Sequence, residues 1–105
     1  MITSTQLTAA GYRKWPERFK QYSKFFYQKR FDYEHGKRYF IQFYEYDPLP
    51  NETEKCYSSD AQFKDSHGNT FNVECLTNDS VEQVEAFFLR VWEHQICEYY
   101  ELFEE

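Results

Sequence analysis

Three cysteines and three histidines are the side chains of this chain that could hold a zinc ion. Their spacing argues against that chemistry, because the sequence contains neither C-x-x-C nor H-x-x-x-H. In the strand register derived below, Cys75 points to the core and Cys56 to the opposite face, while Cys97 lies on the outer side of a predicted helix. We therefore expect three free thiols and no metal site.

Nucleophilic catalysis has no recognisable motif in this sequence. The chain lacks the G-x-S-x-G elbow, the phosphate-binding P-loop and the dinucleotide-binding G-x-G-x-x-G pattern. The run Ser58-Ser59-Asp60 falls in a predicted strand with no histidine near it in sequence. We therefore expect no catalytic residues, no cofactor and no enzymatic activity.

Aromatic and basic side chains, in contrast, form a pattern along residues 24–46. One side of the hairpin predicted there carries four rings beside two arginines, which is too apolar for an ordinary solvated sheet face. Tyrosine and arginine are favoured at protein-binding hot spots, and rings among basic groups can also stack single-stranded nucleic acid. The predicted partner-binding residues are Phe26, Arg30, Arg38, Phe40, Tyr44 and Tyr46.

A second interpretation of this surface is that the N-terminal segment covers it. That segment contains four rings that could supply the cover, namely Tyr12, Trp15, Phe19 and Tyr22. The sheet would then be the middle layer between two covering layers. The sequence leaves both interpretations open.

Two similar turns define the strands that carry these side chains. Glu34-His35-Gly36 and Ser66-His67-Gly68 each fit a three-residue hairpin loop, in which a glycine takes the positive φ. The loops predict strands over residues 24–33, 37–47, 56–65 and 69–76. The predicted opposite pairs are Phe31 with Tyr39, Lys29 with Ile41, Tyr27 with Phe43, Phe25 with Glu45, Phe63 with Phe71, Ala61 with Val73 and Ser59 with Cys75.

Two helices complete the predicted fold. Residues 5–10 form a short helix, with Ser4 or Thr5 as its N-cap and Gly11 at its C-terminal end, and Pro16 begins an irregular stretch. Residues 80–103 form a long helix with an apolar stripe that contains Val84, Phe88 and Trp92. We predict one α+β domain over residues 1–105. Its four-stranded antiparallel meander has the long helix packed on one face, and the sequence does not say which.

Composition shows that the chain folds, and its charge points to partners. The mean hydropathy of −0.90 alone would suggest disorder, but 22% of the 105 residues are aromatic. Residues 12–42 carry nine basic and three acidic side chains, whereas residues 43–105 carry three basic and fifteen acidic ones. Such asymmetry accompanies a face that binds a polyanion or another partner, or it reflects attraction between the two halves of the fold.

Localisation is predicted from what the sequence lacks. No apolar run reaches the roughly 20 residues of a membrane helix, and the N-terminus does not read as a signal peptide. Three cysteines are too few for a disulfide scaffold. We therefore expect a cytoplasmic protein without a membrane partner.

Several segments together resemble small uncharacterised proteins of phage and prophage genomes. These are G-Y-R-K-W, Y-Q-K-R-F-D, G-K-R-Y-F-I, Y-E-Y-D and V-E-A-F-F-L-R-V-W, which span most of the chain. The resemblance implies a bacterial cytoplasm, and a host or phage protein as the partner. It implies no activity and no site residues.

The leading hypothesis is therefore a small interaction protein that binds a protein partner, or itself, through the aromatic and basic hairpin face. The alternative is single-stranded nucleic-acid binding on the same face. Against the alternative stand the net charge of −6 and the absence of an RNP1-like motif. A nucleic-acid mimic built on the acidic helix is a third idea, but packing already explains the apolar residues of that helix.

Overall fold

A computed structural model describes residues 2–16, 23–33, 37–48, 50–51, 53, 55–64, 69–75 and 80–104, without the side chains of residues 23, 24, 64 and 95–104. Two helices and five strands make up this part of the chain. They are α1 (Ser4–Ala9), β1 (Arg13–Pro16), β2 (Ser23–Asp32), β3 (Arg38–Tyr46), β4 (Cys56–Lys64), β5 (Thr70–Cys75) and α2 (Val81–Glu104).

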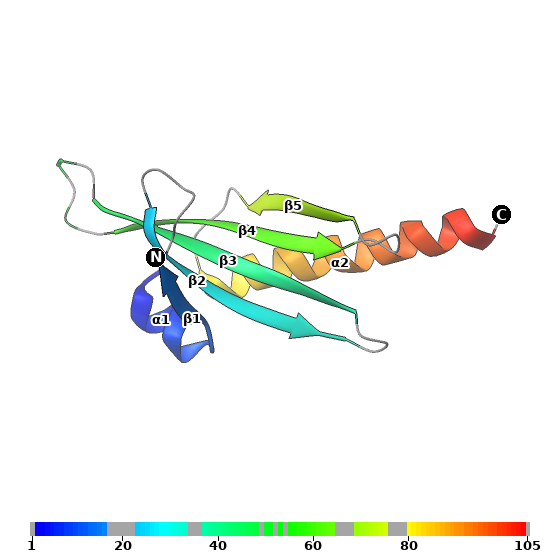
Figure 1. Ribbon diagram of the computed structural model, residues 1–105, viewed down its shortest axis with the longest axis horizontal. Helices are drawn as coiled ribbons and strands as arrows, with labels where there is room; N and C mark the ends of the chain where they lie inside the picture. Colours follow the sequence, from blue (N-terminus) through cyan, green and yellow to red (C-terminus); the bar gives the residue numbers. More distant parts are fainter. Residues whose placement is uncertain are drawn as a thin grey trace.

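The strands form one antiparallel sheet in the order β1-β2-β3-β4-β5 (Figure 1). The predicted α+β class and antiparallel meander are confirmed, but the sheet has five strands, and the prediction of four was wrong. Every predicted pair in β2–β3 and β4–β5 is present. The Tyr33 amide also donates to the Lys37 carbonyl at 2.8 Å, as expected for the first loop.

The additional strand comes from the segment predicted to become irregular at Pro16. Gly11 has φ +94°, which turns the chain back after α1 and lays β1 against Phe25–Gln28 of β2. Pro16 ends this strand, and a proline is tolerated there because the outer side of an edge strand needs no amide donor. Pairing with β1 shields part of the ten-residue edge that β2 would otherwise expose.

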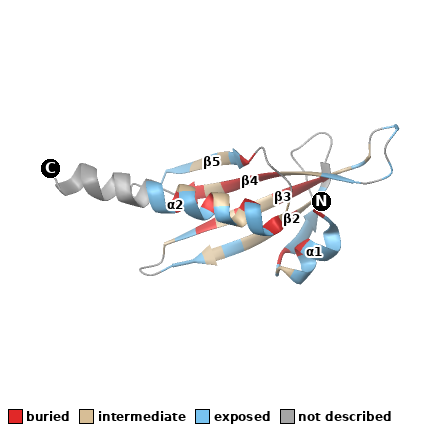
Figure 2. Ribbon diagram, turned by 180° about the vertical axis from the view of Figure 1, so that it is seen from behind, coloured by how far each residue is buried: buried red, intermediate tan, exposed pale blue. Residues whose placement is uncertain are grey.

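Both helices pack on the same face of the sheet, which we call the helix face. Its buried side chains on the strands are Tyr27, Tyr39, Ile41, Phe43, Ala61, Phe63 and Cys75. From α2, Val81, Val84, Phe88 and Trp92 are buried against them, as the apolar stripe predicts (Figure 2). Trp92 lies with its ring centroid 5.1 Å from Tyr33 and 5.3 Å from Tyr39. Burial of these rings therefore holds α2 to the sheet.

The short helix α1 begins one residue earlier than predicted. Thr3, rather than Ser4 or Thr5, is the N-cap, because Thr3 Oγ1 accepts from the Gln6 amide while Gln6 Oε1 accepts from the Thr3 amide. This reciprocal capping box satisfies two amides at the helix start. Leu7 then points into the core and anchors α1 on the helix face.

Candidate interaction surface

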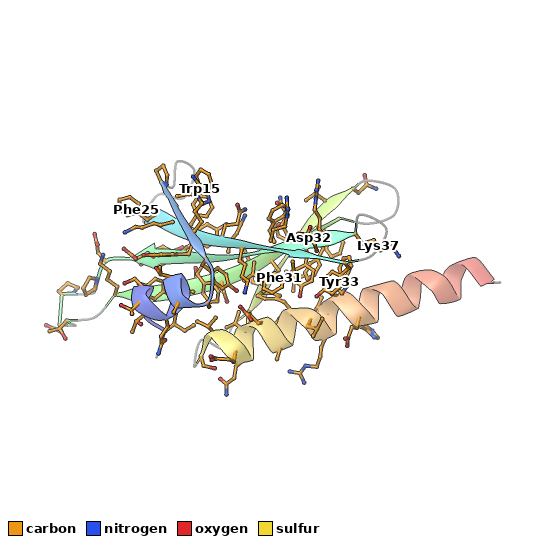
Figure 3. All side chains as sticks on the ribbon, turned by 90° about the horizontal axis from the view of Figure 1, so that it is seen from below. Trp15, Phe25, Phe31, Asp32, Tyr33 and Lys37 are labelled. Atoms are coloured by element: carbon orange, nitrogen blue, oxygen red, sulfur yellow. The ribbon has the colours of Figure 1, made fainter. Side chains whose placement is uncertain are left out.

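The face of the sheet away from both helices carries all six residues predicted to bind a partner. We call it the open face: it consists of Arg13 and Trp15 of β1 and the even-numbered residues of β2 to β5 from Phe26 onward. Figure 3 shows Trp15 on the side of the sheet opposite α2, whereas Phe31 and Tyr33 point toward that helix. The alternation predicted for the hairpin therefore separates the two sets of side chains as expected.

Side chains that are opposite one another on neighbouring strands form rows across the open face, which we call rungs. The rung at one end of the face is aromatic. Trp15 pairs with Phe26, Phe26 with Tyr44, and Tyr44 with Ser58. The Phe26 and Tyr44 ring centroids lie 6.0 Å apart, and the Arg13 guanidinium lies 4.3 Å from the centroid of the Trp15 ring. Trp15 is 37% exposed, Phe26 is half-buried and Tyr44 is buried. The aromatic rung therefore combines three rings with a guanidinium that lies against the ring at the β1 edge.

A polar rung lies next to the aromatic one and spans all five strands. In register order across the sheet it reads Arg13, Gln28, Gln42, Asp60 and Glu74. Tyr44 links the two rungs, because its hydroxyl donates to Gln42 Oε1 at 2.6 Å. The rung is basic at the β1 edge of the sheet and acidic toward the β5 edge.

The remaining predicted residues lie farther along the strands. Arg30 is opposite Phe40 and Arg38 is opposite Asp32, and the Arg30 Nε donates to Asp32 Oδ2 at 3.0 Å. Both arginines are exposed, whereas Phe40 is half-buried. At the other end, the Ser58 hydroxyl donates to the half-buried Tyr46 hydroxyl at 3.4 Å. The structure thus brings the six residues onto one surface, spread over three regions of it.

The interpretation in which N-terminal rings cover this surface is wrong for Tyr12. Tyr12 is buried on the helix face, where its ring lies 5.2 Å from Phe43 and its hydroxyl donates to Glu85 Oε1 at 2.9 Å. Trp15 does reach the open face, but it extends the sheet sideways as part of β1. Phe19 and Tyr22 lie outside the described residues.

Arg13 and Trp15 are therefore surface residues that the sequence reasoning did not assign to the site. The alternation of Arg13, Lys14 and Trp15 is the signal that could have revealed them. Four residues ending in a proline are too short to identify a strand by periodicity alone.

A second polar cluster lies on the helix face around the buried Glu45. Its carboxylate accepts from Lys55 Nζ at 2.7 Å and from the Tyr57 hydroxyl at 3.0 Å. Burial by itself would raise the pKa of Glu45, but these two hydrogen bonds outweigh it and lower that pKa. Burial, and then the Glu45 carboxylate, raise the pKa of Tyr57 above its usual range. These contacts join β3, β4 and the loop between them, which is a structural role.

Metal ligands do not gather in the described part of the chain, where no group of three His, Cys, Asp or Glu side chains could hold an ion. Cys56 is exposed on the open face and Cys75 is buried on the helix face, as the register predicts. The Cys97 side chain lies outside the description. Among the described helices, none is both long and apolar enough to cross a membrane.

Comparison of the chain with protein-family models, with curated proteins and with solved structures found no match. The open face is therefore interpreted from its own geometry and chemistry.

Proposed function

We propose that this chain is a small non-enzymatic interaction protein that binds a protein, or a second copy of itself, through the open face. The observation that carries the proposal is the position of the helices. Both lie on one face of the sheet, while the other presents Trp15, Phe26 and Phe40 beside arginine side chains. Aromatic rings and arginines at a surface of this kind dominate the energetics of protein interfaces.

The setting of this interaction is also a proposal. The resemblance to phage and prophage proteins favours a host or phage protein as the partner, in a bacterial cytoplasm. Charged groups at both edges of the open face would orient an approaching protein and make the association rate depend on salt.

A matched pair of variants tests the proposal, because Trp15 and Leu89 are equally exposed, at 37% each, on different surfaces. Trp15→Ser removes a ring from the open face, whereas Leu89→Ser removes an apolar side chain from the outside of α2. We expect Trp15→Ser to weaken partner or self association at least about tenfold, and Leu89→Ser to leave it unchanged. Equal effects of the two variants would refute the proposal.

Single-stranded nucleic acid is the second candidate, favoured by the exposed Arg30 beside the ring of Phe40. Against it, Asp32, Asp60 and Glu74 lie on the same face. A labelled single strand is titrated with the protein at two salt concentrations. Binding that falls steeply with salt, with a slope reduced by the double change Arg30→Ala and Arg38→Ala, would support nucleic acid. Absence of binding at low salt eliminates it.

A further inference from the structure

The polar rung separates charge across the sheet rather than along it. Arg13 is exposed on edge strand β1, and Glu74 is exposed on edge strand β5. Gln28 and Gln42 lie between them on β2 and β3, and the buried Asp60 adds a second carboxylate beside Glu74. A surface with one basic and one acidic edge at the same level can be complementary to itself.

Two sheets that pack face to face can be related by two kinds of two-fold axis. An axis across the strands would place each edge of the sheet over the same edge of the second copy, so Arg13 would lie on the side of the second Arg13. An axis along the strands places β1 over β5 and β2 over β4. Arg13 then faces Glu74 of the second copy, and Gln28 faces its Asp60. For the polar rung, only the second arrangement pairs opposite charges.

From this complementarity we propose that the open face binds a second copy of the chain, sheet on sheet, about a two-fold axis that runs along β3. The inference rests on the proposed function, because it takes the open face to be the binding surface. The axis places the β1 edge of the open face, with Arg13, over its β5 edge, with Glu74.

The rungs beside the polar one fit the same arrangement. Tyr44 and Phe40 of the central strand β3 lie on the axis, so each meets its own copy. Arg38 at the end of β3 also meets its own copy, and there the Asp32 that pairs with Arg38 supplies an opposite charge in each chain. Five strands spaced about 4.8 Å apart, with the observed lengths, present roughly 600 Å² per copy. The total of about 1,200 Å² reaches the lower limit for stable interfaces. The net charge of −6 opposes association at low salt, so about 0.15 M salt is the condition for the test.

Sedimentation equilibrium of the full chain and its charge variants tests the inference. The wild-type chain should form a dimer with a dissociation constant below about 200 µM. Arg13→Glu should weaken the dimer at least about tenfold, because a two-fold interface contains the Arg13–Glu74 contact twice. Glu74→Arg should do the same. The double variant with both changes should recover wild-type affinity to within about threefold, because the charges have only exchanged places.

Arg90→Glu is the matched control, since Arg90 is exposed on α2, outside the open face. It should leave the dimer unchanged, and circular dichroism confirms that each variant is folded. An axis across the strands predicts instead that Arg13→Glu does not weaken the dimer and that the double variant shows no recovery, which would overturn the inference.

A wild-type chain that stays monomeric at about 200 µM would also overturn the inference. The proposed function is tested separately, because it predicts that Trp15→Ser weakens binding of a different protein at least about tenfold even when the chain is monomeric. If the chain is monomeric but binds a different protein through Trp15, the proposed function stands and the inference of a dimer is refuted. If the chain neither dimerises nor binds another protein through Trp15, both are refuted.

Discussion

The helix face and the open face are built from the same strands by simple alternation, yet their aromatic residues serve different ends. On the helix face, Tyr39 stacks 5.1 Å from Phe31 and contacts Phe63 and Trp92 within a closed core. On the open face, Phe26 and Tyr44 meet at 6.0 Å, and Phe26 lies opposite Trp15, whose ring carries the Arg13 guanidinium. A strand rich in rings on both sides can therefore form a core with one side and present the other to a partner.

Tyr44 is an exception among the rings of the open face, because it is buried. It is on the open face but only 8% exposed, so much of its ring is already in contact within the chain. Tyr44→Ala would therefore combine lost stability with lost binding. Trp15, Phe26 and Phe40 are better probes of binding, because they are exposed or half-buried.

The largest expected effect separates the two tryptophans. Trp92→Ala removes a buried ring from the helix face and should lower the free energy of unfolding by about 3–5 kcal/mol. Trp15→Ala on the open face should lower it by about 1 kcal/mol or less. Denaturant unfolding of both variants measures the contrast. Similar losses would show that the two faces do not differ as the structure indicates.

A smaller effect should appear in acid. Glu45→Gln replaces a buried carboxylate that accepts from Lys55 and Tyr57, and should cost about 1–3 kcal/mol at pH 7. Because the pKa of Glu45 is lowered by folding, its contribution is present above about pH 4.3 and is lost as the pH falls further. Stability measured from pH 7 to pH 3 should decline less in Glu45→Gln. Glu74→Gln on the open face is the control, and an equal flattening there would contradict the assignment.

Stability at alkaline pH should depend on the buried Tyr12 of the helix face. Burial, the charge of Glu85 and the hydrogen bond to it raise the pKa of Tyr12 far above its usual value. Its contribution to stability is therefore full below about pH 10 and lost as the pH rises above that value. Tyr12→Phe should cost about 1 kcal/mol at pH 7 and should reduce the alkaline loss. An unchanged alkaline unfolding curve would show that Tyr12 is solvated.

Thiol chemistry gives the smallest perturbation and compares the faces without changing either core. In a Cys97→Ser background, the exposed Cys56 should react with a disulfide reagent at least about tenfold faster than the buried Cys75. The rates are read from absorbance in the folded protein. Equal rates for the two thiols would mean that the register assigned to β4 and β5 is wrong.

Much of the fold could be predicted because turn chemistry and alternation agree. The two x-H-G patterns predicted the register found in β2–β3 and β4–β5, and that register placed Phe26, Arg30 and Phe40 on one face. The stripe of Val84, Phe88 and Trp92 predicted the cover of the other face.

The rest depended on tertiary contacts that no local pattern contains. The β1 segment is too short to show a period, and it is a strand because β2 offers it an edge to pair with. The face that α2 covers depends on which side of the sheet has the larger apolar surface once β4 is paired with β3. That side carries Phe43 and Phe63, and the opposite side carries Phe40 and Tyr44. The polar rung could be predicted only if the registers of all four strand pairs were known together.

Trp15 can report directly on whether the open face is the binding surface. In a Trp92→Phe background, Trp15 is the single tryptophan. Its emission is followed while the protein forms its complex, with a second copy or with a captured protein. If the open face is the binding surface, the emission should shift to shorter wavelength and acrylamide quenching should weaken as the complex forms. A complex that forms with the Trp15 emission and quenching unchanged would contradict it.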